Sequence, residues 1–453
     1  MSDMTILASP KTEVASLATS LFARVRSSAF VRNAGTLSAG TALGHVFTLA
    51  AAPVLTRIYG PGDFGAFGLF LSFMGVAGDA VTLRFEASIV SGRDESEAAY
   101  LTLASLLLAL PVSVVAGTAL WGLIHFSVLG FGTLPWYSPL LVAVALCSFG
   151  VFSTLRFWCL REHRFKEVSR GVVMQSGARV LIQSAIGFGK FHSAGLLCGE
   201  AFGRCMGMSR MVRDAWPVLR RRWMGFRREQ FMQALWSNRK FPLYSLPSSF
   251  LEALCLGLTV PLLIRLYGVT VGGYYSLVWR AIAVPSVLVT GAVSDTFYSH
   301  MAACARETPD QIMRLFGRTS FCLALLGSIP AIVLWFWGVP LFRSAFGAQW
   351  VVSGSIAAMI APWYLLEFIV SPVSRIVLVL SGQETKLIWD VARLGALLAV
   401  FFLAQSRSLA VIPAIKILTA VNVVLYIAYY LILVRTIVRF NRKRAAQAEA
   451  QAS

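Results

Sequence analysis

The sequence predicts an all-helical membrane protein that crosses a lipid bilayer many times, and three observations lead to that fold class. Hydrophobic residues make up 57% of the 453 residues and charged residues only 13%, about half the usual share for soluble domains. The mean hydropathy is +0.70. Apolar runs of transmembrane length recur along the chain. Because a soluble fold of this size cannot bury so much apolar surface, the composition excludes a soluble enzyme, a disordered chain and a secreted disulfide scaffold.

About twelve segments are apolar over the roughly 20 residues that a transmembrane helix needs. They cover residues 35–58, 65–91, 98–125, 136–159, 168–189, 192–212, 243–266, 272–300, 315–342, 351–380, 385–404 and 408–434. Basic residues concentrate in breaks on one side of this map, as the positive-inside rule requires of cytoplasmic segments. We therefore expect an even number of spans. Twelve is the count on this map, and ten or fourteen would also be even. Both termini should lie in the cytoplasm.

An internal repeat divides the chain into two similar halves. PVLTRIYG at 53–60 matches PLLIRLYG at 261–268, and each copy closes the first span of its half. The copies are six spans apart and so cross the membrane in the same direction, which predicts a parallel repeat about an axis along the membrane normal. The expected regions are an amphipathic cytoplasmic segment (1–32), a six-helix bundle (33–212), a basic linker (213–240), a second six-helix bundle (241–435) and a basic tail (436–453).

Several motif classes are missing from the sequence. The seven cysteines form no CxxC pair and no cluster with metal-ligand spacing, and no GxxxxGK[ST] motif occurs. We therefore expect no metal, no bound cofactor and no ATP hydrolysis by this chain alone. The net charge of +19 sits in short breaks between apolar runs rather than on one soluble face, so we expect no nucleic-acid partner.

Ionisable residues within the spans are the candidate functional residues, because each costs about 2.5–3.5 kcal/mol to insert at mid-membrane. Some of them can neutralise each other on one helix face, namely Glu200 with Arg204 and Asp390 with Arg393. In the span that contains Glu200, glycines 195, 199, 203 and 207 recur every four residues, a pattern typical of close helix packing.

Other ionisable residues have no opposite charge one helical turn away, or share a span with several charges. Arginine binds diphosphate well through its planar fork, and a membrane carboxylate can carry a proton or bind Na⁺. The residue types therefore suit an anionic substrate and a transport cycle coupled to H⁺ or Na⁺. We expect substrate contacts from Arg280, Arg179 and Arg84, and ion coupling through Asp79, Glu252, Asp295 or Glu86.

Four segments resemble one family of membrane proteins. GTALGHVFTLAAAPVLTRIYGPGDFGAFGLFLSF (40–73) with LRFEASIV (83–90), and NRKFPLYSLPSSFLEAL (238–254) with RLYGVTVGGYYSLVWRAIAVPSVLV (265–289), resemble Wzx-type polysaccharide translocases. These belong to the multidrug/oligosaccharidyl-lipid/polysaccharide exporter superfamily. The resemblance implies two six-helix bundles arranged as a V around a central cavity. It adds Arg57 and Arg265, in the repeated motif, to the expected substrate-binding residues.

The resemblance also implies a substrate and partners. The substrate would be an oligosaccharide on undecaprenyl diphosphate, flipped from the cytoplasmic to the periplasmic leaflet for O-antigen, capsule or exopolysaccharide synthesis, which would place the protein in a bacterial inner (plasma) membrane. A polysaccharide polymerase and chain-length machinery would be partners. The main alternative is an ion-coupled multidrug exporter of the same superfamily, which would favour an acidic cavity. A membrane-embedded polymerase or ligase would need a large outer loop, and a scaffold role would leave the intramembrane charges unexplained.

Overall fold

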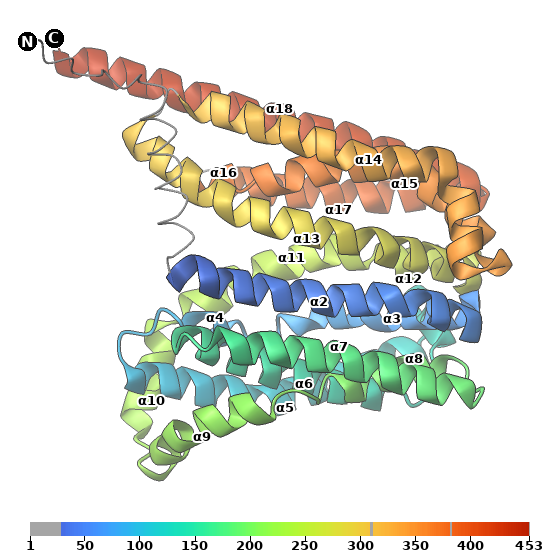
Figure 1. Cartoon of the computed structure of the whole chain (residues 1–453), viewed down its shortest axis with the longest axis horizontal. Coiled ribbons are helices and arrows are strands. Elements are labelled where there is room, and N and C mark those ends of the chain that lie inside the picture. The colour runs from blue at the N-terminus through green and yellow to red at the C-terminus, as the bar shows by residue number, and fades with distance from the viewer. Residues whose placement is uncertain (1–28, 309–310, 381–382, 453) are drawn as a thin grey trace, which may run out of the picture.

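The computed structural model describes residues 29–308, 311–380 and 383–452, which form long helices running side by side (Figure 1). Most of the predicted amphipathic segment 1–32 lies outside these residues. The N-terminal half contains α2 (Ala29–Ile58), α3 (Pro61–Gly78), α4 (Phe85–Ser88), α5 (Glu95–His125), α6 (Ser138–Arg161), α7 (Phe165–Phe188) and α8 (Ser193–Gly203). The linker region contains α9 (Ser209–Met224) and α10 (Arg228–Ser237). The C-terminal half contains α11 (Leu246–Gly257), α12 (Thr259–Tyr267), α13 (Val269–Glu307), α14 (Ile312–Phe346), α15 (Val351–Val373), α16 (Ile376–Val379), α17 (Gln383–Ser406) and α18 (Val411–Ala452).

Every predicted span coincides with a described helix or with a consecutive pair of helices. Eight helical segments of the described residues are long and apolar enough to cross a membrane. The other predicted spans correspond to α3 with α4, α7, α8 with α9, and α13. These segments are shorter or more polar; α8, for example, has 11 residues. The protein is therefore a multi-pass membrane protein, as the sequence predicts.

Two predicted spans of the N-terminal half are interrupted rather than continuous. The span expected at 65–91 stops at Gly78, and Leu83 and Arg84 adopt positive φ angles of 51° and 64° before α4 begins. The span expected at 192–212 stops at Gly203, and α9 runs on from Ser209 past the predicted start of the linker. As a result Asp79 and Arg84 lie on a helix break, where their side chains can approach the junction between the two halves.

The two halves occupy separate sides of the molecule (Figure 1). Within the N-terminal half α2 packs on α7 and α5 on α6, while α14 packs on α15 in the other half. The repeated motif plays the same part in each half. The Tyr59 hydroxyl donates to the Gln183 carbonyl at 2.6 Å, and the Tyr267 hydroxyl donates to the Leu409 carbonyl at 3.0 Å. Each tyrosine thus fixes the end of the first span to its own half.

The halves contact each other closely at one end, which we call the closed end and define by Thr56, Pro61, Gly65, Gly273 and Trp350. A Cβ at Gly273 would collide with the Pro61 carbonyl, and one at Gly65 with the backbone of Val269. The Trp350 indole donates to the Thr56 carbonyl at 3.1 Å. The absence of side chains at the two glycines therefore lets α3 and α13 touch through their backbones.

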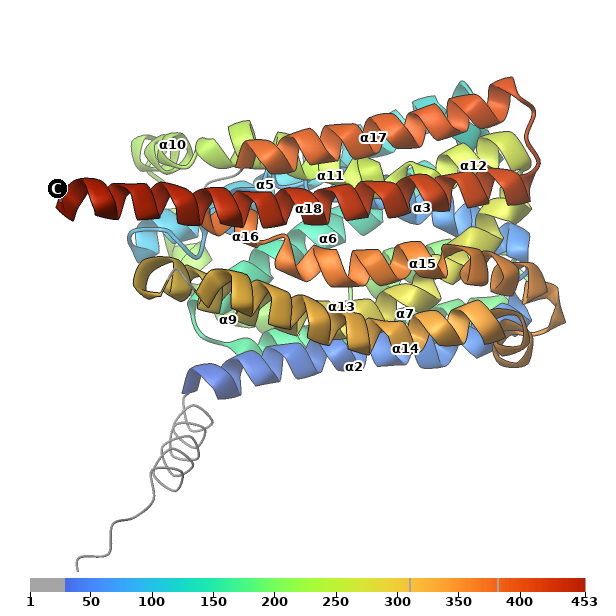
Figure 2. The same cartoon turned by 90° about the horizontal axis from the view of Figure 1, so that it is seen from above.

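The opposite end carries α4, α9 and α10, and we call it the linker end. The start of α2 and the C-terminal part of α18 lie there too (Figures 1 and 2). Both ends of the described chain are thus on one side of the molecule, as an even number of spans requires. Residues 309–310 and 381–382, which lie between described helices, are outside the description.

The glycine repeat packs α8 against α7, as predicted from its spacing. A Cβ at Gly199 would collide with the Gln183 side chain, and one at Gly203 with Arg179. Gly207 lies beyond the end of α8, where its φ of +78° suits glycine. The close approach brings the charged residues of two adjacent spans within bonding distance.

Candidate functional site

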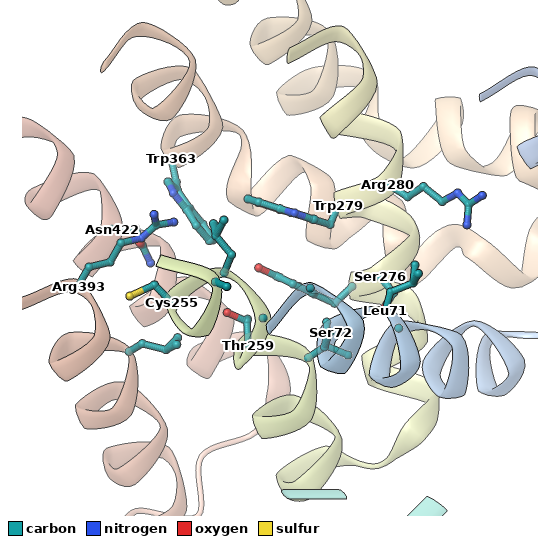
Figure 3. A pocket seen from close by; sticks show the side chains of 18 residues that line it. Leu71, Ser72, Cys255, Thr259, Ser276, Trp279, Arg280, Trp363, Arg393 and Asn422 are labelled. Atoms are coloured by element: carbon teal, nitrogen blue, oxygen red, sulfur yellow. The ribbon is translucent and has the colours of Figure 1, made fainter. Parts of the chain in front are cut away.

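A central cavity of about 380 Å³ lies between the two halves (Figure 3). The N-terminal half contributes Ser72 and neighbouring residues of α3, and the C-terminal half contributes α11, α12, α13, α15, α17 and α18. The polar and aromatic residues in its lining are Ser72, Thr259, Tyr275, Ser276, Trp279, Arg280, Trp363, Arg393 and Asn422. No acidic residue occurs among the described residues that line this cavity, so its fixed charge is positive.

The two arginines occupy different parts of the cavity. Arg393 of α17 lies beside Asn422 and Trp363, whereas Arg280 of α13 lies at the other edge and points away from the tryptophans (Figure 3). Its guanidinium lies 5.2 Å from the ring centroid of Phe67 in the N-terminal half. An anionic group in the cavity would therefore meet a cation on either side.

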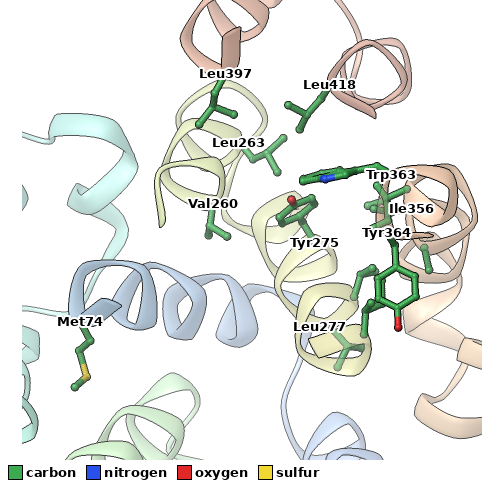
Figure 4. Packing of buried hydrophobic residues seen from close by; sticks show 14 of the residues in the cluster. Met74, Val260, Leu263, Tyr275, Leu277, Ile356, Trp363, Tyr364, Leu397 and Leu418 are labelled. Carbon is green, nitrogen blue, oxygen red and sulfur yellow. The ribbon is translucent and has the colours of Figure 1, made fainter. Parts of the chain in front are cut away.

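Aromatic rings form the wall between the arginines. Tyr275 and Trp279 are stacked with ring centroids 6.3 Å apart, and the rings of Trp279 and Trp363 are 5.6 Å apart. Figure 4 shows Leu397 and Leu418 in the apolar packing around Tyr275 and Trp363. This packing holds the aromatic rings in place. The wall of the cavity therefore combines apolar ring faces with the polar groups of tyrosine and tryptophan.

The predicted pair of Asp390 with Arg393 does not form. Lys386 lies one turn before Asp390 on α17, and its Nζ forms an ion pair with Asp390 Oδ2 at 2.9 Å. Arg393 instead lies 5.5 Å from the ring centroid of Tyr426. The physical reason is that the lysine ammonium pairs with the buried Asp390 carboxylate, so Arg393 lines the cavity and interacts electrostatically with Tyr426 and Glu367 instead.

A second cavity, about 570 Å³, lies towards the linker end, and we call it the entrance cavity. Arg84, Lys240, Lys386 and Glu252 line it together with Phe241, Leu387, Tyr244 and three serines. Helix α11 borders both cavities, with Ser249 and Glu252 on the entrance cavity and Ala253 and Leu256 on the central one. The two cavities therefore lie along the same helix, one with three basic residues and the other with two arginines.

The carboxylates proposed for ion coupling lie in different surroundings. Asp79 is bonded to Arg84 at 3.2 Å, and the half-exposed Glu252 to Lys386 at 3.1 Å. Glu86 is buried and accepts a hydrogen bond from the Thr82 hydroxyl. Asp295 is on α13 in a stretch whose side chains the structure does not describe. Of these residues, Glu252 lines a cavity directly, and Asp79 reaches one through Arg84.

An arginine cluster lies within the membrane region, and we define it as Arg179, Arg204, Arg280 and Glu200. The Glu200 carboxylate, 3% exposed, is 3.2 Å from Arg179 and 2.6 Å from Arg204. The pair with Arg204 confirms the sequence prediction, and Arg179 finds its partner on the neighbouring helix. Arg280, from the other half, interacts electrostatically with Glu200 and Arg179. With three guanidiniums and one carboxylate, the cluster carries a net charge of +2.

Arg57 and Arg265 lie apart from both cavities. Both side chains are exposed, and Arg57 donates to the Pro53 carbonyl of its own helix at 2.9 Å. Their assignment to substrate binding stays a prediction. Sequence reasoning left Arg393, Lys240, Lys386 and Asn422 out of the site. The position of Lys386 one turn from Asp390 offered a second partner for the aspartate but did not rank it above Arg393.

Comparisons with known proteins identify the fold. No family model matches the sequence, and no curated protein matches it significantly. An inward-facing multidrug resistance MATE family transporter of the MOP superfamily superposes with a TM-score of 0.66 at 15% identity, covering 89% of this chain and 96% of that one. An outward-facing conformation of such a transporter gives 0.58 at 15% identity, covering 91% and 96%.

A third solved structure differs in the function suggested for it. It is a MOP superfamily transporter from Pyrococcus furiosus, described as having a binding pocket of reverse polarity that suggests a different function. It superposes with a TM-score of 0.59 at 14% identity, covering 90% of this chain and 96% of that one. The protein therefore has the fold of the MATE transporters of the MOP superfamily.

Proposed function

We propose that this protein is an alternating-access transporter, with twelve spans in two six-helix bundles. Its substrate would be an oligosaccharide on undecaprenyl diphosphate, which it moves from the cytoplasmic to the periplasmic leaflet of a bacterial inner membrane for surface polysaccharide synthesis. The observation that carries the proposal is the central cavity between the halves, which has two arginines and no acidic residue among its described lining residues. Such a site attracts an anionic substrate and repels a cationic one.

The two cavities suggest how the substrate would move. The diphosphate would enter at the linker end among Arg84, Lys240 and Lys386, and pass along α11 to Arg393 and Arg280. The polyprenyl tail would stay in lipid, since transferring it to a polar cavity would expose its apolar surface. The closed end would prevent release until the halves separate there. The higher TM-score against the inward-facing structure supports this assignment of the ends.

The energy source and the partners belong to the same proposal. H⁺ or Na⁺ coupling would act through Glu252, which faces the entrance cavity and is held by Lys386. If the incoming diphosphate drew the Lys386 ammonium away from Glu252, the Glu252 carboxylate would be free to take up H⁺ or Na⁺. A polymerase and chain-length machinery would receive the flipped unit on the periplasmic side.

The test measures lipid-linked oligosaccharide in cells that lack the protein. We expect undecaprenyl-diphosphate glycan to accumulate on the cytoplasmic face, located by side-specific labelling of inverted vesicles. Arg393→Ala and Arg280→Ala should reproduce this accumulation at normal protein levels. Arg439→Ala, an exposed arginine of α18, is the matched control and should complement the deletion. Wild-type polysaccharide in both cavity variants would refute the assigned headgroup contacts, and periplasmic accumulation would indicate a polymerase or ligase instead.

A multidrug exporter is the second candidate, because solved structures with this fold include multidrug resistance transporters. The polarity of the cavity favours the first candidate. The transporter from Pyrococcus furiosus supports using pocket polarity in this way within one fold. A deletion strain with unchanged lipid-linked glycan and raised sensitivity to cationic drugs would establish the exporter.

A further inference from the structure

An apolar groove lies on the outer side of the N-terminal half, away from both transport cavities. It has a volume of about 510 Å³, within the range of about 300–1,000 Å³ usual for ligand sites. Leu106 of α5, Leu155 of α6 and Trp216 and Trp223 of α9 form its walls. Arg220 is the charged residue among those that line it.

Helix α9 is amphipathic and presents two different faces. Met211, Ala215 and Leu219 are buried against α5 and α6, and they fix the helix to the bundle. Trp216 and Trp223 remain 58% and 56% exposed beside the groove. Tryptophan side chains concentrate at the membrane–water interface, where one edge of the ring is polar and the rest apolar.

The charges of α9 are unbalanced. Its one acidic residue, Asp214, is held by Arg164 at 2.7 Å. Among the described residues, Arg213, Arg220, Arg221 and Arg222 have no carboxylate partner. Three of these arginines are consecutive and lie in the last turns of α9, towards the linker end (Figure 1). This turn therefore offers several unpaired guanidiniums next to an apolar groove.

The depth of the groove matches a lipid of the bilayer. Leu103 lies eight residues into α5, and Leu155 lies six residues before the end of α6. At 1.5 Å per residue, the groove lies about 9–12 Å from the charged helix ends. On α9 the lining residues run from Val212 to Met224, so the three arginines lie at the end of the groove nearest these helix ends.

The geometry points to a binding site for one anionic phospholipid. An acyl chain occupies the groove between α5, α6 and α9, and the phosphate binds Arg220 at the groove, with Arg221 and Arg222 adding positive potential from the same turn. The pairing follows from charge complementarity, since the guanidinium fork binds phosphate oxygens bidentately. The site is separate from the proposed transport function, because none of its residues lines either transport cavity.

The test compares phosphatidylglycerol with phosphatidylcholine of the same acyl chains, bound to the purified full-length protein and measured by native mass spectrometry. Replacing Arg220, Arg221 and Arg222 together with Gln should weaken phosphatidylglycerol binding by about fivefold per arginine, at roughly 1 kcal/mol each. The same change at Arg435, Arg439 and Arg442, which are exposed on α18, is the charge-matched control and should leave this site intact. Phosphatidylcholine binding should be weak and equal in all three proteins.

A second measurement tests the groove itself. Brominated phosphatidylglycerol should quench tryptophan fluorescence more than brominated phosphatidylcholine does, and Trp216→Phe with Trp223→Phe should remove this difference; the other exposed tryptophans, such as Trp136, should be quenched equally by both lipids. Equal loss of lipid in both arginine triples, or a difference between the two lipids that persists without the two tryptophans, would overturn the proposal. So would a gain in phosphatidylglycerol binding when residues 1–28 are removed, because the chain's own N-terminal segment would then be the occupant.

Discussion

Replacing Gly273 with Ala should separate the two halves at the closed end. The new Cβ would overlap the Pro61 carbonyl, a backbone atom that cannot rotate away. Overpacking of this kind costs about 1–3 kcal/mol. The cost applies to the conformation in which α3 and α13 touch, so the balance of conformations should shift by roughly 5–150-fold towards the one that is open at this end.

Side-specific labelling would measure the shift. A single cysteine in place of Ser72, in a variant without the seven native cysteines, would report on the central cavity. An impermeant thiol reagent should label it mainly from the cytoplasmic side in the parent and mainly from the periplasmic side with Gly273→Ala. Gly75→Ala is the matched control, because a Cβ there meets nothing within 4 Å. Identical labelling ratios for the two glycine variants would refute the argument that backbone contact holds this end closed.

Three further substitutions test the packing and the charges by thermal unfolding of the purified protein. Glu200→Gln leaves Arg179 and Arg204 without their carboxylate and should lower the free energy of unfolding by about 3–5 kcal/mol. Adding Arg204→Met should recover part of that loss. Wild-type stability of the single variant would contradict the role given to the cluster. Lys386→Met leaves the buried Asp390 carboxylate without its ion-pair partner and should lower the free energy of unfolding by about 1–3 kcal/mol. Replacing Glu252, whose side chain is half-exposed, should lower it by less than about 1 kcal/mol. Equal losses in the two variants would contradict this ranking. Tyr59→Phe removes a buried hydrogen bond and should cost about 0.5–1.5 kcal/mol, and an unchanged midpoint would show that this bond contributes nothing.

Periodicity and hydropathy predicted the membrane fold well, because the length of an apolar run is set by bilayer thickness alone. The same reasoning missed the breaks after Gly78 and Gly203, since a hydropathy plot carries no information on φ angles. The pair of Glu200 with Arg204 could be read from i,i+4 spacing. That of Glu200 with Arg179 could not, because it depends on how α7 packs against α8.

The positive charge of the central cavity was predictable, but the residues that line it were only partly so. Arginines within the spans suggested a cationic cavity, and Arg280 does line it. Arg393 was assigned to a local ion pair, because sequence spacing alone cannot rank Lys386 against it as the partner of Asp390. Lys240 seemed to belong to the linker, yet the fold of η2 (Phe241–Ser245) returns it to the entrance cavity.

The positive charge of the arginine cluster would couple a movement of the two halves to the membrane potential. An elementary charge that crosses the whole field gains or loses about 2.3 kcal/mol per 100 mV. The cluster holds a net +2 between the halves, so any rearrangement that carries it along the membrane normal is electrically driven. A bound diphosphate would cancel much of that charge. The conformational change with substrate bound would then depend little on voltage, whereas the return of the empty protein would depend on it. The resting potential would therefore affect the rate of the return step alone.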